Sequence, residues 1–197
     1  GEALATGPNI NVTSNGKAIM TPAERADARA AIDQALALTD GLTPKERDWI
    51  QALDQRYDGQ AETPRDPLDR AWADALADMA ERYPDDTTVA SVYAEALMNT
   101  MPWDYWGPNG EAKPDTQAVI ASLEAVMEAD PDHPLALHLY IHALEASSNA
   151  AKAELAADRL ANLVPGSGHL VHMPSHIYFG VGRYQDSALA NLRAAEV

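Results

Sequence analysis

The sequence predicts an all-α fold in which antiparallel helix pairs stack into a solenoid. Helix-start signals recur, with a Thr-Pro-x-Glu run at Thr21–Glu24 and again at Thr43–Glu46. No segment shows the alternation of apolar and polar residues that is typical of a strand. The sequence also contains an internal repeat, because a shift of 34 positions aligns the segment around His138 with the segment around His172.

Turn residues and apolar spacing set the limits of the expected helices. We expect helices over residues 22–38, 44–57, 66–83, 86–99, 115–129, 134–146, 150–163, 169–181 and 184–196. In the first of them the expected apolar contacts are Ala30, Ile32, Leu36 and Leu38. Pro174 lies inside the helix expected at 169–181, where it should kink the helix or delay its regular part.

The connection at residues 100–114 is rich in proline and glycine and should not be helical. It also contains Trp103, Tyr105 and Trp106. Three aromatic residues in one loop indicate that the loop folds back and packs, either as a hydrophobic plug over a core edge or as a lid over a ligand.

Composition limits the classes of protein to which the chain can belong. With 197 residues, of which 46% are hydrophobic, it is long enough for a core, and we expect one domain over residues 1–197. A formal net charge of −16 argues against a nucleic-acid partner. There is no cysteine, hence no thiolate metal site, and no apolar run of membrane-spanning length. Because Gly1–Leu4 resembles the end of a helix, we expect the chain to be part of a longer one.

All six histidines lie between Pro131 and Tyr184. His138 and His142 are four residues apart, and the 34-residue shift places them on His172 and His176. Each pair should project from one face of a helix, and stacked repeats would bring the two pairs together. Such a pair can chelate a divalent metal ion when further ligands are near. A kink at Pro174 would weaken this geometry by turning one histidine of its pair away.

A five-residue pattern recurs along the chain: an aromatic residue, any residue, a polar residue, Ala and Leu. It suggests which carboxylate could be a further metal ligand. The polar positions form a column whose members are Glu2, Gln51, Glu95, His142 and His176. The column makes Glu95 the natural fifth ligand beside His138, His142, His172 and His176. A mixed His and carboxylate site suits zinc, iron(II) or manganese, and histidines alone suit copper. If the site is catalytic, Glu145 is the candidate general base.

Two interpretations without metal stay open. The histidines can form a buried hydrogen-bond network with Glu95, Glu145 and nearby tyrosines. They can also line a concave groove that binds a peptide, a protein or a polar small molecule. His133 is expected to be solvated in a turn, and His169 to be either a residue of the helix start or an additional ligand.

The repeat length, the run Gly182–Tyr184 and the repeat ends at Pro131 and Pro165 resemble tetratricopeptide repeat proteins. The chain also resembles a bacterial subfamily of them, through the phrases Gly1–Leu4, Gly7–Asn11, Tyr83–Asp86, Asp130–Pro134, His138–Glu145 and Gly168–Ile177. The resemblance implies a right-handed α-solenoid and no particular reaction. Signatures of nucleophilic hydrolases, phosphate loops and dinucleotide folds are absent from the sequence.

Overall fold

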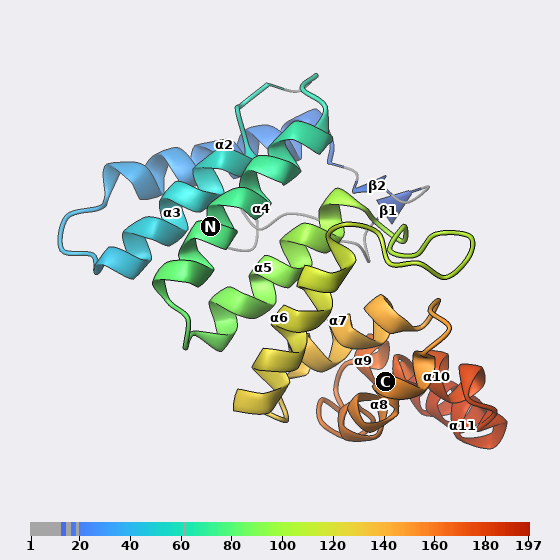
Figure 1. The fold of residues 1–197 in the computed structure, drawn as a ribbon. Coiled ribbons are helices and arrows are strands. Elements are labelled where there is room, and N and C mark those ends of the chain that lie inside the picture. The colour runs from blue at the N-terminus through green and yellow to red at the C-terminus, as the bar shows by residue number, and fades with distance from the viewer. Residues whose placement is uncertain (1–12, 15–16, 19, 61) are drawn as a thin grey trace. The chain divides into compact units, whose positions relative to one another are not determined.

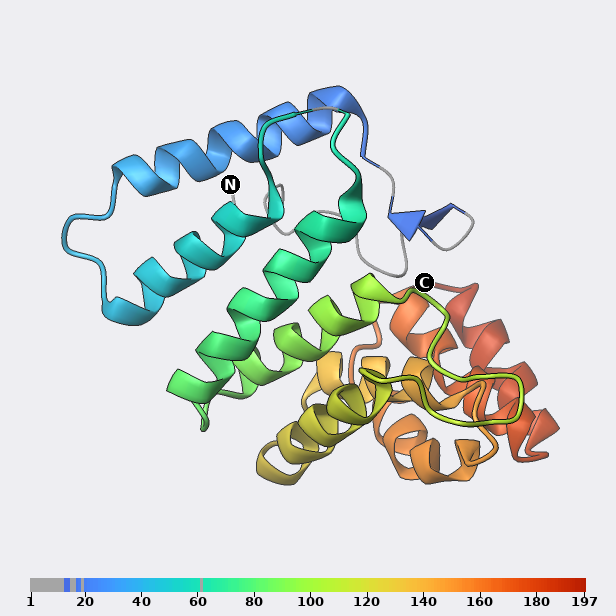
Figure 2. The ribbon, with the colours of Figure 1, turned by 45° about the horizontal axis from the view of Figure 1, so that its top comes forward.

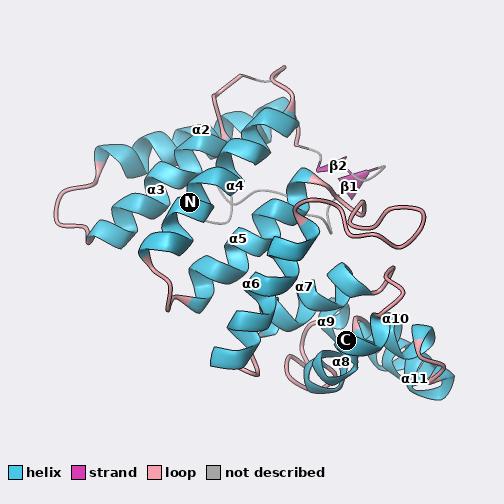
Figure 3. Cartoon of the chain, viewed as in Figure 1, coloured by secondary structure: helices cyan, strands magenta, loops and turns pink. Residues whose placement is uncertain are grey.

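A computed structural model describes residues 13–14, 17–18, 20–60 and 62–197 of the chain. The first phrase of the family resemblance and the column member Glu2 therefore lie outside the described residues. The described part is helical, as expected, except for one short antiparallel ladder (Figure 3). Strand β1 (Thr13–Ser14) pairs with β2 (Lys17–Ala18), although the sequence showed no strand pattern.

The contacts divide the chain into two compact units, Gly1–Trp103 and Asp104–Val197, called unit 1 and unit 2 below. No helix in the described residues has the length and apolar character needed to cross a membrane. The expectation of a single domain over residues 1–197 stays a prediction.

Unit 1 consists of four described helices that pack in neighbouring pairs. They are α2 (Pro22–Ala37), α3 (Pro44–Arg56), α4 (Arg65–Arg82) and α5 (Thr87–Thr100). Each packs on the next in the sequence, and Figures 1 and 2 show that successive helices run in opposite directions. The bounds agree with the sequence prediction to within one or two residues.

The helix starts of unit 1 follow from their capping residues. At α2 the Glu24 amide donates to the Thr21 hydroxyl at 3.3 Å, and the Thr21 amide donates to the Glu24 carboxylate at 2.7 Å. Thr43 and Glu46 form the same reciprocal pair at the start of α3. These capping boxes satisfy amide groups that have no partner within the helix, which confirms the predicted starts.

The buried face of α2 differs from the predicted one. Ala28 and Ile32 are buried with Tyr57, and Leu36 packs at the edge of this cluster. Ala30 is exposed and Leu38 is 72% exposed, so the prediction was wrong for both. Ala30 lies two positions from Ala28 and from Ile32, which in a helix is the opposite side, and Leu38 follows the last helical residue.

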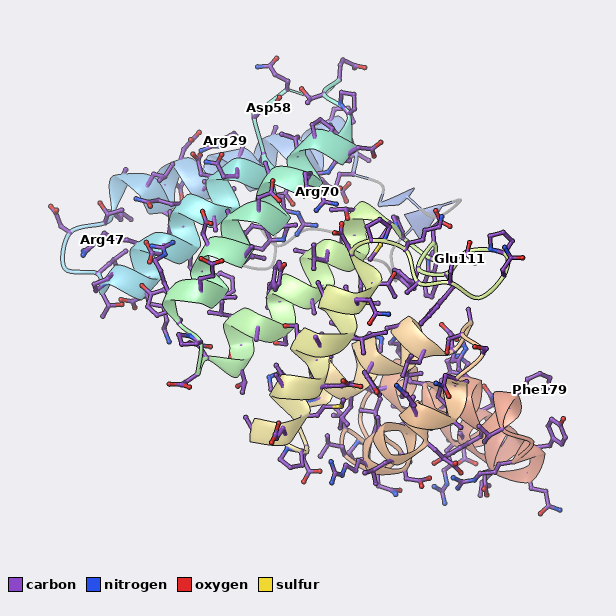
Figure 4. All side chains as sticks on the ribbon, viewed as in Figure 1. Arg29, Arg47, Asp58, Arg70, Glu111 and Phe179 are labelled. Atoms are coloured by element: carbon purple, nitrogen blue, oxygen red, sulfur yellow. The ribbon has the colours of Figure 1, made fainter. Side chains whose placement is uncertain are left out.

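Unit 1 also buries a network of charges. Arg56 and Asp69, which are 4% and 5% exposed, approach to 3.7 Å, and Asp69 forms a second ion pair with Arg65. The Arg56 guanidinium lies over the ring of Trp72 at 5.7 Å from its centroid. Arg29 of α2, which Figure 4 labels, forms an ion pair with Asp54 of α3 at 2.8 Å.

Unit 2 contains seven described helical segments, which again pack in pairs. They are α6 (Thr116–Ala129), α7 (Pro134–Leu144), the 3₁₀ helix η1 (Ala150–Ala153), α8 (Glu154–Leu160), α9 (Gly168–His172), α10 (Pro174–Gly180) and α11 (Tyr184–Ala194). Helix α7 packs against α6, α8 and α10, and α11 packs against α9 and α10. The helix expected at 150–163 begins with one 3₁₀ turn, and the helix expected at 169–181 is broken into α9 and α10.

The aromatic loop between the last helix of unit 1 and α6 folds back, as predicted, within unit 2. Tyr105 is 3% exposed, and Trp106 forms a β-bridge with Ala112. The Trp106 indole N–H donates to the Ala143 carbonyl of α7 at 2.7 Å, so it satisfies an acceptor in the last turn of that helix. Trp103, at the boundary of the units, is 45% exposed.

Candidate metal centre

Helix α7 carries two histidines into the interior of unit 2. Every residue from Ala136 to Leu144 is buried, including His138 at 5% and His142 at 3% exposure. The helix begins at Pro134, where the ring of His133 acts as the N-cap and its Nδ1 accepts from the Ala136 amide at 3.3 Å. Because α7 is buried on all sides, its imidazoles need polar partners within the protein.

The partners come from the broken helix pair α9–α10. Met173 keeps helical dihedral angles (φ −50°, ψ −42°), but Pro174 lacks the N–H that would continue the hydrogen-bond ladder. The expected break therefore occurs, but it does not separate the predicted pair. The Nε2 atoms of His172 and His176 face each other at 2.9 Å.

Three imidazoles from the two elements form a group that we call the three-histidine cluster: His138, His142 and His169. One ligand nitrogen from each lies within 4.8 Å of those of the other two. The His138 and His169 Nε2 atoms are 3.0 Å apart. The ring centroids of His138 and His142 are separated by 4.8 Å. Two cluster members are buried, whereas His169 is exposed and gives the cluster a side that solvent can reach.

One carboxylate connects this cluster with the second pair, His172 and His176. Glu145 Oε1 lies 2.8 Å from His142 Nδ1, and its Oε2 lies 2.5 Å from His176 Nδ1. Burial alone would raise the pKa of Glu145, but the hydrogen bonds from the two imidazoles outweigh it and lower the pKa to about 2. The group is therefore an ionised acceptor for two ring N–H groups at neutral pH.

The same hydrogen bond decides which nitrogen of His142 carries its lone pair. With Nδ1–H donated to Glu145, the neutral ring keeps its lone pair on Nε2. A histidine that donates one nitrogen to a carboxylate and offers the other to a metal is the usual arrangement around protein-bound ions.

Burial favours the neutral form of two cluster members, His138 and His169. Burial, with smaller contributions from the His142 and His169 rings, lowers the pKa of His138 from 6.5 to about 3. Burial and the neighbouring imidazoles also lower the pKa of His169. A neutral imidazole is the form that binds metal, so protons compete weakly for these nitrogens near neutral pH.

The spacing of the nitrogens suits a shared ion. Two imidazoles bound to one tetrahedral zinc at about 2.0–2.1 Å have their nitrogens about 3.3 Å apart. The 3.0 Å between His138 and His169 differs from this by a few tenths of an ångström, and a direct N–H···N hydrogen bond has a similar length. Geometry alone therefore permits both a metal site and a hydrogen-bond network.

The predicted site residues are divided by the structure. His138 and His142 lie together, and His172 and His176 face each other beside them, whereas Glu95 belongs to α5 of unit 1, where its charge acts on Arg56. The role of Glu95 as a ligand stays a prediction. Glu145 is held by two imidazoles at a pKa of about 2, which favours an orienting role over the predicted role of general base.

His169 is the cluster member that the predicted ligand set left out. It precedes His172 by three residues and His176 by seven, so all three belong to one helix face. That spacing was the available signal for the third ligand.

Comparisons with known proteins give no family, since no family model, curated protein or solved structure matches the chain. The case for a function therefore depends on the geometry of the site.

Proposed function

We propose that the chain binds a divalent transition-metal ion on the three-histidine cluster of His138, His142 and His169. The observation that carries this proposal is the convergence of three imidazoles, two of them buried, from helices that are distant in the sequence. Ligands supplied by nitrogen alone suit zinc, iron(II) or copper(II) better than magnesium or calcium, which prefer oxygen.

Three imidazoles fill three positions of a tetrahedral ion and leave the fourth open. They are uncharged, so the ion keeps its full positive charge, which lowers the pKa of a bound water or polarises a bound carbonyl. Glu145 orients His142, and the exposed His169 places the open side toward solvent. The site thus has the ligand set of a metal centre that admits a small molecule, and we assign no reaction to it.

The scaffold that we propose is a right-handed solenoid of tetratricopeptide type. Its support is the spacing of the elements in unit 2, where α6, η1 and α11 begin at Thr116, Ala150 and Tyr184, at 34-residue intervals. Helices α7 and α9 begin 34 residues apart as well, at Pro134 and Gly168. This is the period of the tetratricopeptide repeat, and in such arrays first helices line a concave face.

The test is metal analysis of the protein purified without a histidine tag, then dialysed against zinc, iron(II) or copper(II). We expect at least one tightly bound equivalent, with an affinity that falls at least tenfold in His138→Ala and in His169→Ala. The matched control is His133→Asn, because His133 caps α7 outside the cluster and asparagine is a good N-cap.

Retention of the full wild-type metal content and affinity by both alanine variants would contradict the proposal, as would absence of bound metal in the wild type for all three ions. In the second case the alternative function is a metal-free repeat scaffold that binds a protein, peptide or small-molecule partner. The search would then turn to that partner.

A further inference from the structure

The second pair, His172 and His176, lies next to the three-histidine cluster but is not part of it. Its two Nε2 atoms are 2.9 Å apart, whereas the metal-compatible group contains only His138, His142 and His169 among the described residues. The side chain of His176 is 33% exposed, so solvent and dissolved ions reach the pair. What joins the two Nε2 atoms depends on where each ring carries its proton.

The tautomer of His176 is fixed by Glu145. The His176 Nδ1 lies 2.5 Å from Glu145 Oε2, and an ionised carboxylate has no proton to donate. The ring must therefore donate Nδ1–H, which leaves the lone pair of the neutral ring on Nε2.

The tautomer of His172 is fixed independently by Asn191 of α11. The His172 Nδ1 lies 2.6 Å from Asn191 Oδ1, which only accepts. The amide is held in this orientation because Asn191 Nδ2 donates to the Ser187 carbonyl at 2.9 Å. A flipped amide would set Asn191 Oδ1 against that carbonyl oxygen. His172 must therefore also donate Nδ1–H and keep its lone pair on Nε2.

With both rings neutral, two lone pairs point at each other across 2.9 Å, and they repel unless a proton or a metal ion lies between them. We propose that His172 and His176 bind a second divalent transition-metal ion through their Nε2 atoms, at a position separate from the three-histidine cluster. The nitrogens need to open by a few tenths of an ångström to reach the spacing of about 3.3 Å around a tetrahedral ion. Solvent or a small ligand completes the coordination.

Glu145 couples the two positions. One of its oxygens orients His142 of the three-histidine cluster and the other orients His176 of the second pair. Substitution of glutamine leaves only one acceptor oxygen, so one of the two rings must move its proton to Nε2. Glu145→Gln should therefore weaken one position at least tenfold while the other remains close to its original affinity.

The decisive experiment is a titration of the metal-free protein with zinc, followed by calorimetry and equilibrium dialysis. We expect two equivalents for the wild type and one for His172→Ala and for His176→Ala. The doubly substituted His138→Ala, His169→Ala protein should keep one equivalent, bound at the second pair. Circular dichroism of each metal-free variant checks its fold, and His176→Gln, whose amide can still donate to Glu145, serves if His176→Ala unfolds.

Each result decides between the two sites. A wild type that binds only one equivalent, and keeps it in His172→Ala and His176→Ala, would overturn the second position and leave the three-histidine site intact, and a proton would then join the pair. A wild type that binds only one equivalent, and loses it in His172→Ala but keeps it in His169→Ala, would support the second position and remove the three-histidine site. Binding of no zinc would overturn both.

Discussion

Units 1 and 2 both bury polar side chains, but they satisfy them in opposite ways. In unit 1 the buried charges are of both signs: Arg56 and Arg65 share Asp69. In unit 2 the buried polar groups include the imidazoles of His138 and His142, and Glu145 at their edge accepts from His142 and from His176. The first arrangement pairs opposite charges, whereas the second leaves ring nitrogens converging on one another. Buried polar groups thus form ion pairs in unit 1, and in unit 2 they form the cluster on which the proposed metal site rests.

The largest effect should come from breaking the buried ion pairs of unit 1. Asp69→Asn removes the negative charge that pairs with Arg56, which is 4% exposed, and with Arg65. We expect a loss of roughly 3–5 kcal/mol in the free energy of unfolding, measured by urea denaturation. Metal content should not change, because Asp69 belongs to unit 1.

The matched control is Asp74→Asn, at an ion pair with Arg70 whose aspartate side chain is 70% exposed. A change within about 0.5 kcal/mol is expected there. Equal effects of the two substitutions would show that the buried ion pairs of Asp69 contribute no more to the free energy of unfolding than the exposed pair of Asp74.

Acid should destabilise the metal-free form through the imidazoles of unit 2. The pKa of His138 is about 3 in the folded protein and near 6.5 when the chain is unfolded, so between these values the unfolded chain binds more protons. Stability should therefore fall as the pH drops from about 6.5 toward 3, and the loss should be of the order of 3 kcal/mol at pH 4. The groups that act on this ring are His142, His169, His176 and Glu145.

Thermal unfolding in the presence of a chelator, followed between pH 7 and pH 4, measures this slope. The lowered pKa of Glu145 has the same sign, with stability lost as the pH falls from 4.5 toward 2. His138→Gln, which has no titrating ring, should flatten the dependence. An unchanged slope in that variant would rule out His138 as its source.

Metal should stabilise unit 2 by mass action. With free zinc at about a hundred times its dissociation constant, unfolding should cost about 2.7 kcal/mol more than in chelator. Asp69→Asn should leave this increment unchanged, whereas His142→Ala should abolish most of it. If Asp69→Asn reduces the stabilisation by zinc, the ion pairs of unit 1 and the imidazoles of unit 2 are energetically coupled.

A smaller effect is expected where the aromatic loop meets α7. Trp106→Phe removes the indole donor 2.7 Å from the Ala143 carbonyl and leaves that acceptor without its partner, at a cost of about 1–2 kcal/mol. Since Ala143 adjoins His142, zinc affinity should also fall a few-fold. Trp103→Phe, at a residue that is 45% exposed, is the control and should change neither quantity measurably.

The smallest effect should follow the loss of a helix cap in unit 1. Thr43→Ala removes the hydroxyl that accepts from the Glu46 amide at 3.3 Å and should cost about 1 kcal/mol. Zinc binding should be unaffected. A clear loss of metal in this variant would show that the site depends on the stability of the whole chain, not on local geometry.

The helices could be predicted because their signals are local. The caps at Thr21 and Thr43 and the proline at Pro134 lie within one turn of the starts that they determine. The 34-residue shift also brought His142 and His176 into correspondence, and the two rings lie 5.9 Å apart. Because His142 and His176 occupy equivalent positions of a sequence repeat, the sequence predicted that they would lie close together.

The rest of the site depended on contacts that no local pattern contains. Asn191 reaches His172 from a helix 19 residues further on. Glu145 holds two imidazoles because α7 packs against α10, and the buried pairing of Arg56 with Asp69 joins separate helices. The side chains themselves gave no sign of these partners, since Glu and Asn are ordinary surface residues in most helices.

The central claim is that the imidazoles of unit 2 bind a transition-metal ion, and X-ray absorption at the zinc edge tests it most directly. Protein loaded with one equivalent of zinc should show a first shell of nitrogen at about 2.0–2.1 Å, with the multiple scattering of about three imidazoles. When His138 and His169 are both replaced by alanine, the three-imidazole signal should fall to that of the two imidazoles of His172 and His176. A shell of oxygen ligands alone, or zinc that washes away, would contradict the claim and return these histidines to a hydrogen-bond network.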